Sequence, residues 1–240
     1  MAVRTNPYDE AATEYAEIVA AGRIGSTSSI QPPVLPRLLD YAGDVAGRSV
    51  LDAGCGEGHV ARTLAQQGAK VTAVDLSPRL IAIARERDPV TGTIYLVHDL
   101  SAPLPQYRAS FDLVVSNLVL PDVDDYRGYI ATLGDVLKPG GRAVLSLLNP
   151  YRAVTDERVR DYFDSGRGTR EYGGMAKQGV RAYYYHRTLE EYITTFRESG
   201  LLLSDLADVC PTDEMLASGH PIATKNYHLP LFMVLAFLKQ

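Results

Sequence analysis

The residues best suited to bind a ligand lie in one short segment, in which three glycines alternate with other residues. Gly54, Gly56 and Gly58 follow an apolar run and precede a helical pattern. Glycine allows the backbone to approach a ligand closely and tolerates a positive φ, and the N–H groups at the start of a helix favour an anionic group such as a carboxylate. The next apolar run ends in Asp75, whose carboxylate can accept hydrogen bonds from both hydroxyls of a ribose. These residues predict a site for an adenosine-type ligand in an α/β sheet.

The spacing of the glycines distinguishes between classes of adenosine ligand. A dinucleotide-binding loop has the pattern G-x-G-x-x-G, whereas this chain has G-x-G-x-G, and His59 stands in the position after it. A phosphate-binding pattern of the form G-x-x-x-x-G-K-[ST] does not occur in the sequence. The spacing therefore disfavours NAD, and a dehydrogenase that uses NAD is kept only as an alternative.

The glycine loop, preceded by Leu51 and Asp52, resembles motif I of class I S-adenosylmethionine-dependent methyltransferases, in which the loop faces the methionine half of the cofactor. Further segments similar to motifs of this family follow in the same order, namely residues 74–78, 97–100, 111–117 and 137–142. Residues 8–15 resemble the N-terminal cap helix of the family, and residues 185–189 with 230–232 resemble the C-terminal part of a subgroup that methylates small molecules.

This resemblance covers nearly the whole chain and implies both a cofactor and a fold. The cofactor would be S-adenosyl-L-methionine. The fold would be α/β, with a Rossmann-like doubly wound sheet of seven strands whose last strand is antiparallel. An N-terminal helical cap and a lid insertion after the fifth strand would complete it.

The resemblance also implies which residues hold the cofactor. Asp75 would bind the ribose, Asp99 the adenine amino group, and Asp52 would support the loop close to the amino group of the ligand. The predicted cofactor-binding residues are Tyr8, Tyr15, Asp52, Gly54, Cys55, Gly56, Asp75, Leu76, Asp99, Leu100 and Asn117. Asp99 has a structural alternative, since it is also suited to a turn with its own backbone. Glu57 is not among the predicted ligand contacts, because a favourable position in the first helical turn explains this acid better.

Two residues are candidates for catalysis on the acceptor side. Many members of the family carry histidine after the strand at 111–117, where this chain has Pro121 and Asp122. Asp122 is therefore predicted to orient the acceptor or receive its proton, with a solvated turn acid as the alternative. His186 follows three tyrosines and precedes a helical pattern, so it contacts either the acceptor or its own helix. The histidines and cysteines show no metal-ligand spacing, so no metal site is predicted.

Alternating apolar and helical patterns predict the elements that position these residues. Strands are expected near residues 49–53, 70–74, 93–97, 111–116, 142–148, 201–208 and 230–238, and helices near residues 7–20, 36–41, 58–67, 78–87, 125–137 and 188–199. The chain would divide into a cap (1–45), a cofactor-binding core (46–148), a lid insertion for the acceptor (149–187) and the C-terminal part of the core sheet (188–240). Loops as long as the predicted lid are usually functional, and its residues 156–163 are expected to be helical.

Composition bounds the function further. The 240 residues carry a net charge of −5, which argues against a nucleic-acid partner because such proteins usually show a basic patch. The apolar stretch at 229–238 is too short to span a bilayer, and the expected location is the cytoplasm. The sequence thus predicts an enzyme that transfers a methyl group to an oxygen or nitrogen of a small-molecule acceptor. A protein or peptide methyltransferase and a non-catalytic protein that binds S-adenosylmethionine are the alternatives, and the oligomeric state stays open.

Overall fold

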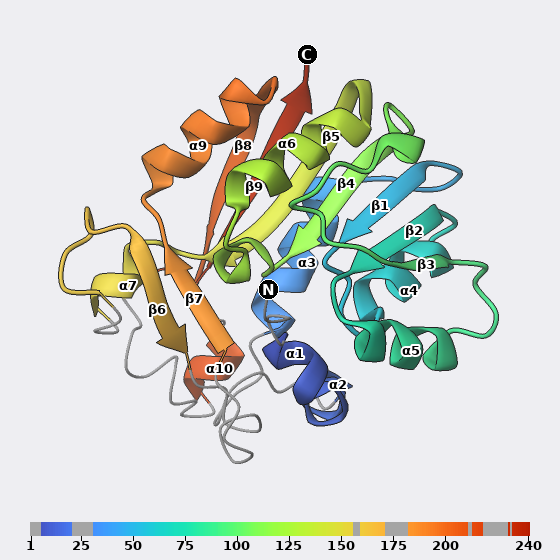
Figure 1. Ribbon diagram of the computed structural model, residues 1–240, viewed down its shortest axis with the longest axis horizontal. Coiled ribbons are helices and arrows are strands. Elements are labelled where there is room, and N and C mark those ends of the chain that lie inside the picture. The colour runs from blue at the N-terminus through green and yellow to red at the C-terminus, as the bar shows by residue number, and fades with distance from the viewer. Residues whose placement is uncertain are drawn as a thin grey trace, which may run out of the picture.

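Seven strands form one mixed sheet, in the order β3-β2-β1-β4-β5-β9-β8 (Figure 1). The computed structural model describes residues 6–20, 31–155, 159–170, 182–210, 213–217, 230 and 232–240. The strands are β1 (Ser49–Ala53), β2 (Lys70–Asp75), β3 (Ile94–Val97), β4 (Phe111–Asn117), β5 (Leu137–Leu148), β8 (Leu201–Val209) and β9 (Phe232–Lys239). Strands β1 to β5 are parallel, and β9 runs antiparallel to both β5 and β8. The predicted fold, including its antiparallel last strand, is confirmed.

Helices cover both faces of this sheet and create two apolar layers. On one face α3 (Gln31–Ala42), α4 (His59–Gln66) and α5 (Pro78–Arg87) pack against β1, β2 and β4. On the other face lie α6 (Tyr126–Val136) and α9 (Leu189–Glu198). Neighbouring residues of a strand point to opposite faces, so Val50 enters the first layer and Leu51 the second. Because both faces are buried, the strands are apolar almost throughout.

The order of the strands fixes where a ligand binds. The chain proceeds outward from β1 to β2 and β3, and then returns to place β4 on the other side of β1. Open parallel sheets bind ligands beyond the carboxyl ends of the strands at such a reversal. The glycine loop follows β1, so it lies at this point of the sheet.

The N-terminal segment forms two helices where the sequence predicts one. Helix α1 (Pro7–Glu10) and helix α2 (Ala12–Ala20) are separated by Ala11, whose φ of −107° and ψ of 26° interrupt the helix. The break allows α1 to contact the start of α5 and α2 to contact its end, through Asp9 and Ala16 respectively. Helix α3 begins five residues earlier than expected and contains Pro36 in its interior.

The interval between β5 and α9 contains a short hairpin. Helix α7 (Arg152–Thr155) is followed by β6 (Gly166–Arg170) and β7 (Ala182–His186), which pair antiparallel. The prediction of a helix at 156–163 is wrong for residues 159–163, and residues 156–158 lie outside the described part. The carboxylate of Asp161 accepts a hydrogen bond from the Phe163 N–H at 2.9 Å, so this side chain stabilises a turn in place of a helix.

The remaining elements are short. They are the 3-10 turns η1 (Pro105–Tyr107) and η2 (Leu120–Asp122) and the helix α10 (Asp213–Ala217). Within the described ranges, every helix is too short or too polar to cross a lipid bilayer.

Candidate active site

The glycine loop has the backbone geometry that its sequence predicts. Gly54, Gly56 and Gly58 have φ values of +78°, +55° and +84°, a region that side chains other than glycine rarely adopt. The N–H of Gly54 donates to the carbonyl of Val74 at 2.8 Å, which holds the loop over the end of β2. A Cβ on Gly54 would also lie 2.6 Å from Cγ1 of Val119, so this glycine is required by a neighbouring side chain as well as by its φ.

Asp75 connects the glycine loop to the start of α5. Its Oδ2 accepts a hydrogen bond from the Gly56 N–H at 2.8 Å, and its Oδ1 accepts one from the Ser77 N–H at 2.9 Å. Burial raises the pKa of Asp75, although these N–H groups oppose the shift. Each carboxylate oxygen can accept further hydrogen bonds. The geometry is therefore compatible with the predicted ribose contact, which stays a prediction.

Asp52 is a buried acid with few partners. It is 1% exposed, and neither carboxylate oxygen makes a hydrogen bond of normal geometry with the described residues. Burial and the neighbouring charges of Asp75 and Glu57 raise its pKa to about 7, while the Ala61 N–H opposes the shift. A buried carboxylate without donors is costly, and a cationic group beside it would remove that cost.

A cavity opens between the glycine loop and the cap. Its walls come from α2, from the end of β1, from the glycine loop and from the end of β4. The lining residues are Tyr15, Val19, Asp52, Gly54, Cys55, Gly56, Glu57, His59, Val60, Asn117 and Leu118. The cap thus contributes directly to the site, and Tyr15 packs edge-on against Tyr8 with ring centroids 5.1 Å apart.

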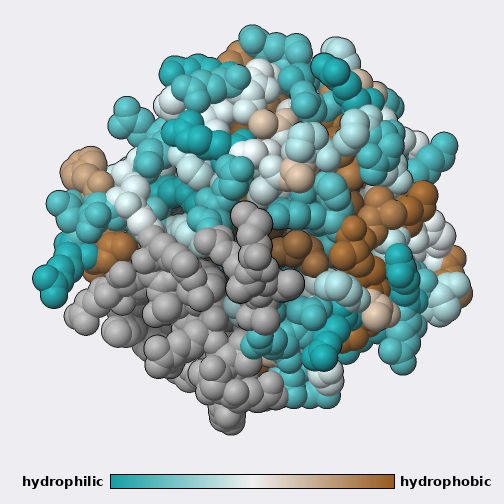
Figure 2. All heavy atoms as spheres, viewed as in Figure 1, coloured by the Kyte–Doolittle hydropathy of each residue, from teal (hydrophilic) through white to brown (hydrophobic). Residues whose placement is uncertain are grey.

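The predicted adenine contacts lie outside this cavity, on the side where β2 and β3 end. The His98 N–H donates to the Asp75 carbonyl at 3.0 Å, which places the segment after β3 beside Asp75. Leu76 is 52% exposed while Leu100 is buried, and Figure 2 shows apolar side chains at the surface over this part of the sheet. Asp99 is exposed and accepts a hydrogen bond from the Ser101 N–H at 2.9 Å. This bond forms the turn that the sequence offered as the alternative role of Asp99. The contact of Asp99 with adenine stays a prediction.

Residues at the end of β4 complete the cavity wall. Asn117 accepts a hydrogen bond from the Ser146 hydroxyl at 2.7 Å, so it is fixed to β5. Leu118 follows with a φ of +60°, a conformation that is rare outside glycine, and this residue also lines the cavity. The sequence analysis did not identify Leu118 or Val119, because apolar residues beyond a strand carry no chemical signal.

The two acceptor-side candidates have different surroundings. Asp122 lies in η2, and its Oδ2 accepts a hydrogen bond from the Tyr8 hydroxyl at 2.6 Å. His186 is 1% exposed, and its Nε2 lies 2.7 Å from the Tyr162 carbonyl. The Tyr162 ring also packs against the imidazole, with centroids 5.6 Å apart. His186 therefore has the local contacts of a core residue, and its contact with an acceptor stays a prediction.

Arg187, next to His186, was not identified from the sequence. It is 6% exposed and joins the β6–β7 hairpin to the loop after β4. Its guanidinium donates to the carbonyls of Leu120, Val123 and Asp124 at 3.2, 2.6 and 2.9 Å. It also lies over the ring of Tyr126, 4.2 Å from the centroid, where a cation is stabilised by the aromatic face. This side chain fixes the loop that carries Asp122.

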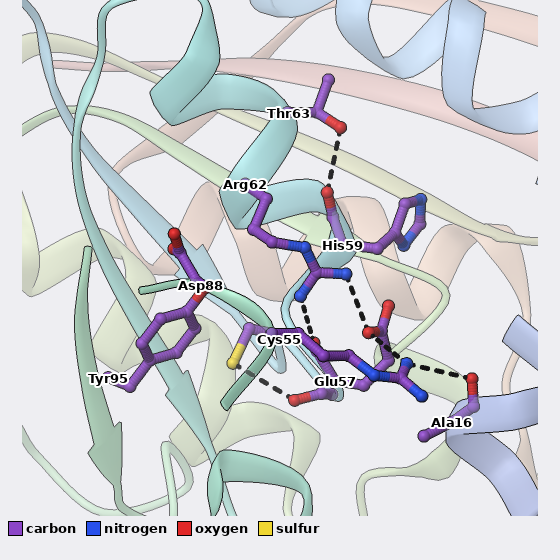
Figure 3. Close-up of polar contacts among 10 residues, drawn as sticks. Ala16, Cys55, Glu57, His59, Arg62, Thr63, Asp88 and Tyr95 are labelled. Carbon is purple, nitrogen blue, oxygen red and sulfur yellow. Dashed lines mark hydrogen bonds and ion pairs between the residues drawn. The ribbon is translucent and has the colours of Figure 1, made fainter. Parts of the chain in front are cut away.

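A second set of charges is centred on Glu57 of the glycine loop. Glu57 is 2% exposed and forms ion pairs with Arg62 at 2.8 Å and Arg87 at 2.7 Å. Arg87 also donates to the carbonyl of Ala16 in α2 at 3.2 Å. Figure 3 shows Glu57 with Arg62 on one side and Ala16 of the cap on the other. Glu57 precedes Gly58, the N-cap of α4, so it lies outside the first helical turn that the sequence suggested for it, and it is instead the centre of two ion pairs.

Comparison with known proteins identifies the family. A protein-family model described as a methyltransferase domain matches residues 51–145. A ubiquinone biosynthesis O-methyltransferase from Xanthomonas euvesicatoria pv. vesicatoria is 38% identical over 180 residues, which cover 72% of this chain and 71% of that protein. The chain belongs to the S-adenosylmethionine-dependent methyltransferase family.

Two further matches show the range of proteins to which this methyltransferase is similar. A malonyl-[acyl-carrier protein] O-methyltransferase from Serratia marcescens is 36% identical over 130 residues, but the match covers only 54% of this chain and 49% of that protein. The crystal structure of an S-adenosylmethionine-dependent methyltransferase from Mesorhizobium loti is 28% identical, with a TM-score of 0.72 over 86% of this chain and 98% of that one. The predicted family and cofactor are confirmed, and the NAD alternative is set aside.

The residues of the cavity fit S-adenosyl-L-methionine. Within the described ranges the buried Asp52 carboxylate has no hydrogen bond of normal geometry, and the cofactor carries an ammonium group that would neutralise it. The glycines at 54 and 56 leave room for backbone contact, and Asp75 lies next to the loop with acceptor capacity for a ribose. When bound, the cofactor supplies an electrophilic methyl group on a positively charged sulfur.

Proposed function

We propose that this methyltransferase transfers the methyl group to an oxygen atom of a small-molecule acceptor. The observation that carries the proposal is the buried Asp52 beside the glycine loop, since it fits the methionine end of the cofactor and so orients the sulfur. The choice of oxygen is supported by two relatives that are O-methyltransferases. The substrates of those relatives differ, so the acceptor of this protein is proposed only as a small hydroxyl or carboxyl compound.

In this proposal the protein acts mainly by positioning the cofactor and the acceptor. Asp52 holds the ammonium, Asp75 the ribose, and residues 76, 99 and 100 surround the adenine. Tyr15 and Val19 of the cap exclude water from the cavity. Methyl transfer of this kind depends chiefly on aligning the acceptor oxygen with the methyl carbon and the sulfur, so covalent catalysis is not required.

Asp122 is the proposed contact of the acceptor hydroxyl. It lies in the loop after β4, at the edge of the sheet where the cofactor loop also lies. Its partner Tyr8 would keep the carboxylate in place, and Asp122 would receive the proton of a hydroxyl acceptor as the new bond forms. A carboxylate acceptor is already ionised and would need only orientation.

We also propose that the protein acts in the cytoplasm. Its net charge of −5 supports the proposal that it has no nucleic-acid partner.

The test has a binding arm and a transfer arm. In the first, calorimetry compares S-adenosylmethionine, S-adenosylhomocysteine and NAD, and saturable binding of NAD alone would overturn the cofactor assignment. In the second, methyl-labelled S-adenosylmethionine is incubated with catechols, phenols, small carboxylic acids, primary amines and a mixture of peptides. Label on the oxygen compounds supports the proposal. Label only on amines or peptides, or binding without transfer to any class, would contradict it.

A further inference from the structure

Arg87 connects two walls of the cofactor cavity that come from distant parts of the sequence. One of its terminal nitrogens, Nη1, donates both to Glu57 Oε2 at 2.7 Å and to the Ala16 carbonyl at 3.2 Å. Glu57 lies in the glycine loop and lines the cavity. Ala16 follows Tyr15, which lines the cavity from the cap side. This guanidinium group therefore links the cap directly to the glycine loop.

Arg62 binds the same glutamate but has a different role. It donates to the Glu57 carbonyl at 2.6 Å and to Glu57 Oε2 at 2.8 Å. Both contacts lie within the glycine loop and α4. Arg62 thus stabilises the loop itself, whereas Arg87 extends the same ion pair to the cap. The two arginines form a natural pair of test and control residues.

Among the described residues, further hydrogen bonds between the cap and α5 lie at the other end of that helix. Asp9 accepts hydrogen bonds from the Ser77 hydroxyl at 2.6 Å and from the Arg79 N–H at 3.0 Å. These bonds hold α1 at the start of α5, whereas Arg87 lies in the last turn and holds α2. The α2 residues that line the cavity, Tyr15 and Val19, lie on the helix that the Arg87 contact holds, and Tyr15 also packs against Tyr8 of α1.

Because Glu57 is buried, the contact from the glycine loop through Arg87 to Ala16 depends on the arginines that neutralise this carboxylate. The side chain is 2% exposed, while those of Arg62 and Arg87 are 20% and 32% exposed. A buried carboxylate needs its charge partners, and ion pairs of this kind are screened less by salt than those on the surface. We propose that Arg87 is a positioning residue that, through Glu57, holds the cap closed over the bound cofactor and slows its release. This inference rests on the cofactor occupying the cavity.

The test compares Arg87→Met with Arg62→Met in the full chain. For Arg87→Met we expect the dissociation rate of S-adenosylhomocysteine to rise on the order of 10-fold, the effect of losing one hydrogen bond to a charged group. Amide exchange of residues 12–20 in the bound state should rise in the same variant. For Arg62→Met, exchange of residues 12–20 should stay at the wild-type level. Arg87→Lys, which keeps a charged donor, should restore part of the slow release.

Further controls separate this inference from a general loss of stability and from failure of the cofactor assignment. Arg85→Met alters a neighbouring residue of α5 that bonds to the Tyr95 carbonyl, and it should leave the dissociation rate unchanged. If Arg87→Met and Arg62→Met alter release and cap exchange equally, or if Arg87→Met alters neither, the proposal is overturned. If the wild-type protein does not bind S-adenosylhomocysteine at all, the cofactor assignment fails instead.

Discussion

The hydroxyl of Tyr8 donates a hydrogen bond of 2.6 Å to Oδ2 of Asp122, and so joins the first helix to the loop after the fourth strand. The sequence analysis assigned these residues to separate sites, one to the cofactor and one to the acceptor. Their contact means that the cap is attached to the acceptor side as well as to α5. A change in one site is therefore expected to affect the other.

We expect Tyr8→Phe and Asp122→Asn to show this coupling in a double-mutant cycle. Each single variant should lower the free energy of unfolding, and the double variant should lose less than the sum. The interaction energy should be roughly 1 kcal/mol, typical of a partly exposed hydrogen bond to a charged group. Urea unfolding with and without S-adenosylhomocysteine measures it. Strict additivity would show that the bond contributes no stability.

Substitution of Asp75 should weaken cofactor binding. Asp75→Asn keeps the size of the side chain but removes the charge that would accept two ribose hydroxyls. The affinity for S-adenosylhomocysteine should fall by roughly 1.5–3 kcal/mol, as for other hydrogen bonds to a charged group. Calorimetry measures the affinity. The control is Asp44→Asn, which alters an exposed loop acid bonded to the Ala46 N–H and should bind normally.

The raised pKa of Asp52 predicts a pH dependence of stability. In the folded protein without cofactor the pKa is about 7, against an ordinary value of 3.8. The folded state therefore holds a proton that the unfolded chain releases, and the free energy of unfolding falls as the pH rises between these two values. The loss should be on the order of 4 kcal/mol. Roughly 3 kcal/mol of this loss falls between pH 5 and pH 8, and Asp52→Asn should lack it when urea unfolding is measured at these two pH values.

The same group predicts how binding depends on pH. An ammonium beside Asp52 favours the ionised carboxylate, so binding below pH 7 must expel a proton. The affinity for S-adenosylhomocysteine should therefore fall as the pH decreases from 8 to 6. Calorimetry in two buffers of different ionisation enthalpy detects the released proton. A pH-independent affinity in the wild-type protein would place the ammonium elsewhere.

Gly54 should not tolerate a side chain. Its φ is +78°, and an added Cβ would meet Val119. Gly54→Ala should therefore destabilise the fold by roughly 1–3 kcal/mol from backbone strain and overlap. In the double variant with Val119→Ala, the overlap is relieved while the strain remains. Partial recovery in urea unfolding is expected, and no recovery would mean that Val119 is not the obstacle.

Once an acceptor is found, turnover should separate Asp122 from His186. For a hydroxyl acceptor, Asp122→Asn should lower kcat on the order of 10²–10⁴-fold, the usual contribution of a general base. His186→Ala should instead lower the free energy of unfolding, because the imidazole is buried against Tyr162. Wild-type turnover in Asp122→Asn would remove this residue from the mechanism. If His186→Ala lowers kcat without lowering the free energy of unfolding, His186 takes part in the mechanism.

The sequence predicts best where a backbone requirement dictates the residue type. The glycines at 54, 56 and 58 and the acid at 75 predicted the adenosine-type ligand, and the family resemblance they carry implied the cofactor and the seven-stranded sheet with its antiparallel last strand. The pairs that hold the site together were not predictable, because Tyr8 with Asp122 and Arg87 with Ala16 are distant in the chain. Helix boundaries also depended on local side-chain bonds, as the turn at Asp161 shows. Arg187 gave no signal, since a buried arginine is not distinguishable from a surface one in sequence.

Arg187 fixes the position of the β6–β7 hairpin relative to the loop after β4. Its guanidinium binds three backbone carbonyls, and a carbonyl is the same in every residue type. The side chains of the hairpin and of the loop after β4 can therefore change while the hydrogen bonds of Arg187 are kept. Such an arrangement allows the hairpin to diverge, or to be exchanged by recombination, while the cofactor half is conserved. A library for new acceptors would accordingly vary the segment before Arg187 and leave this residue intact.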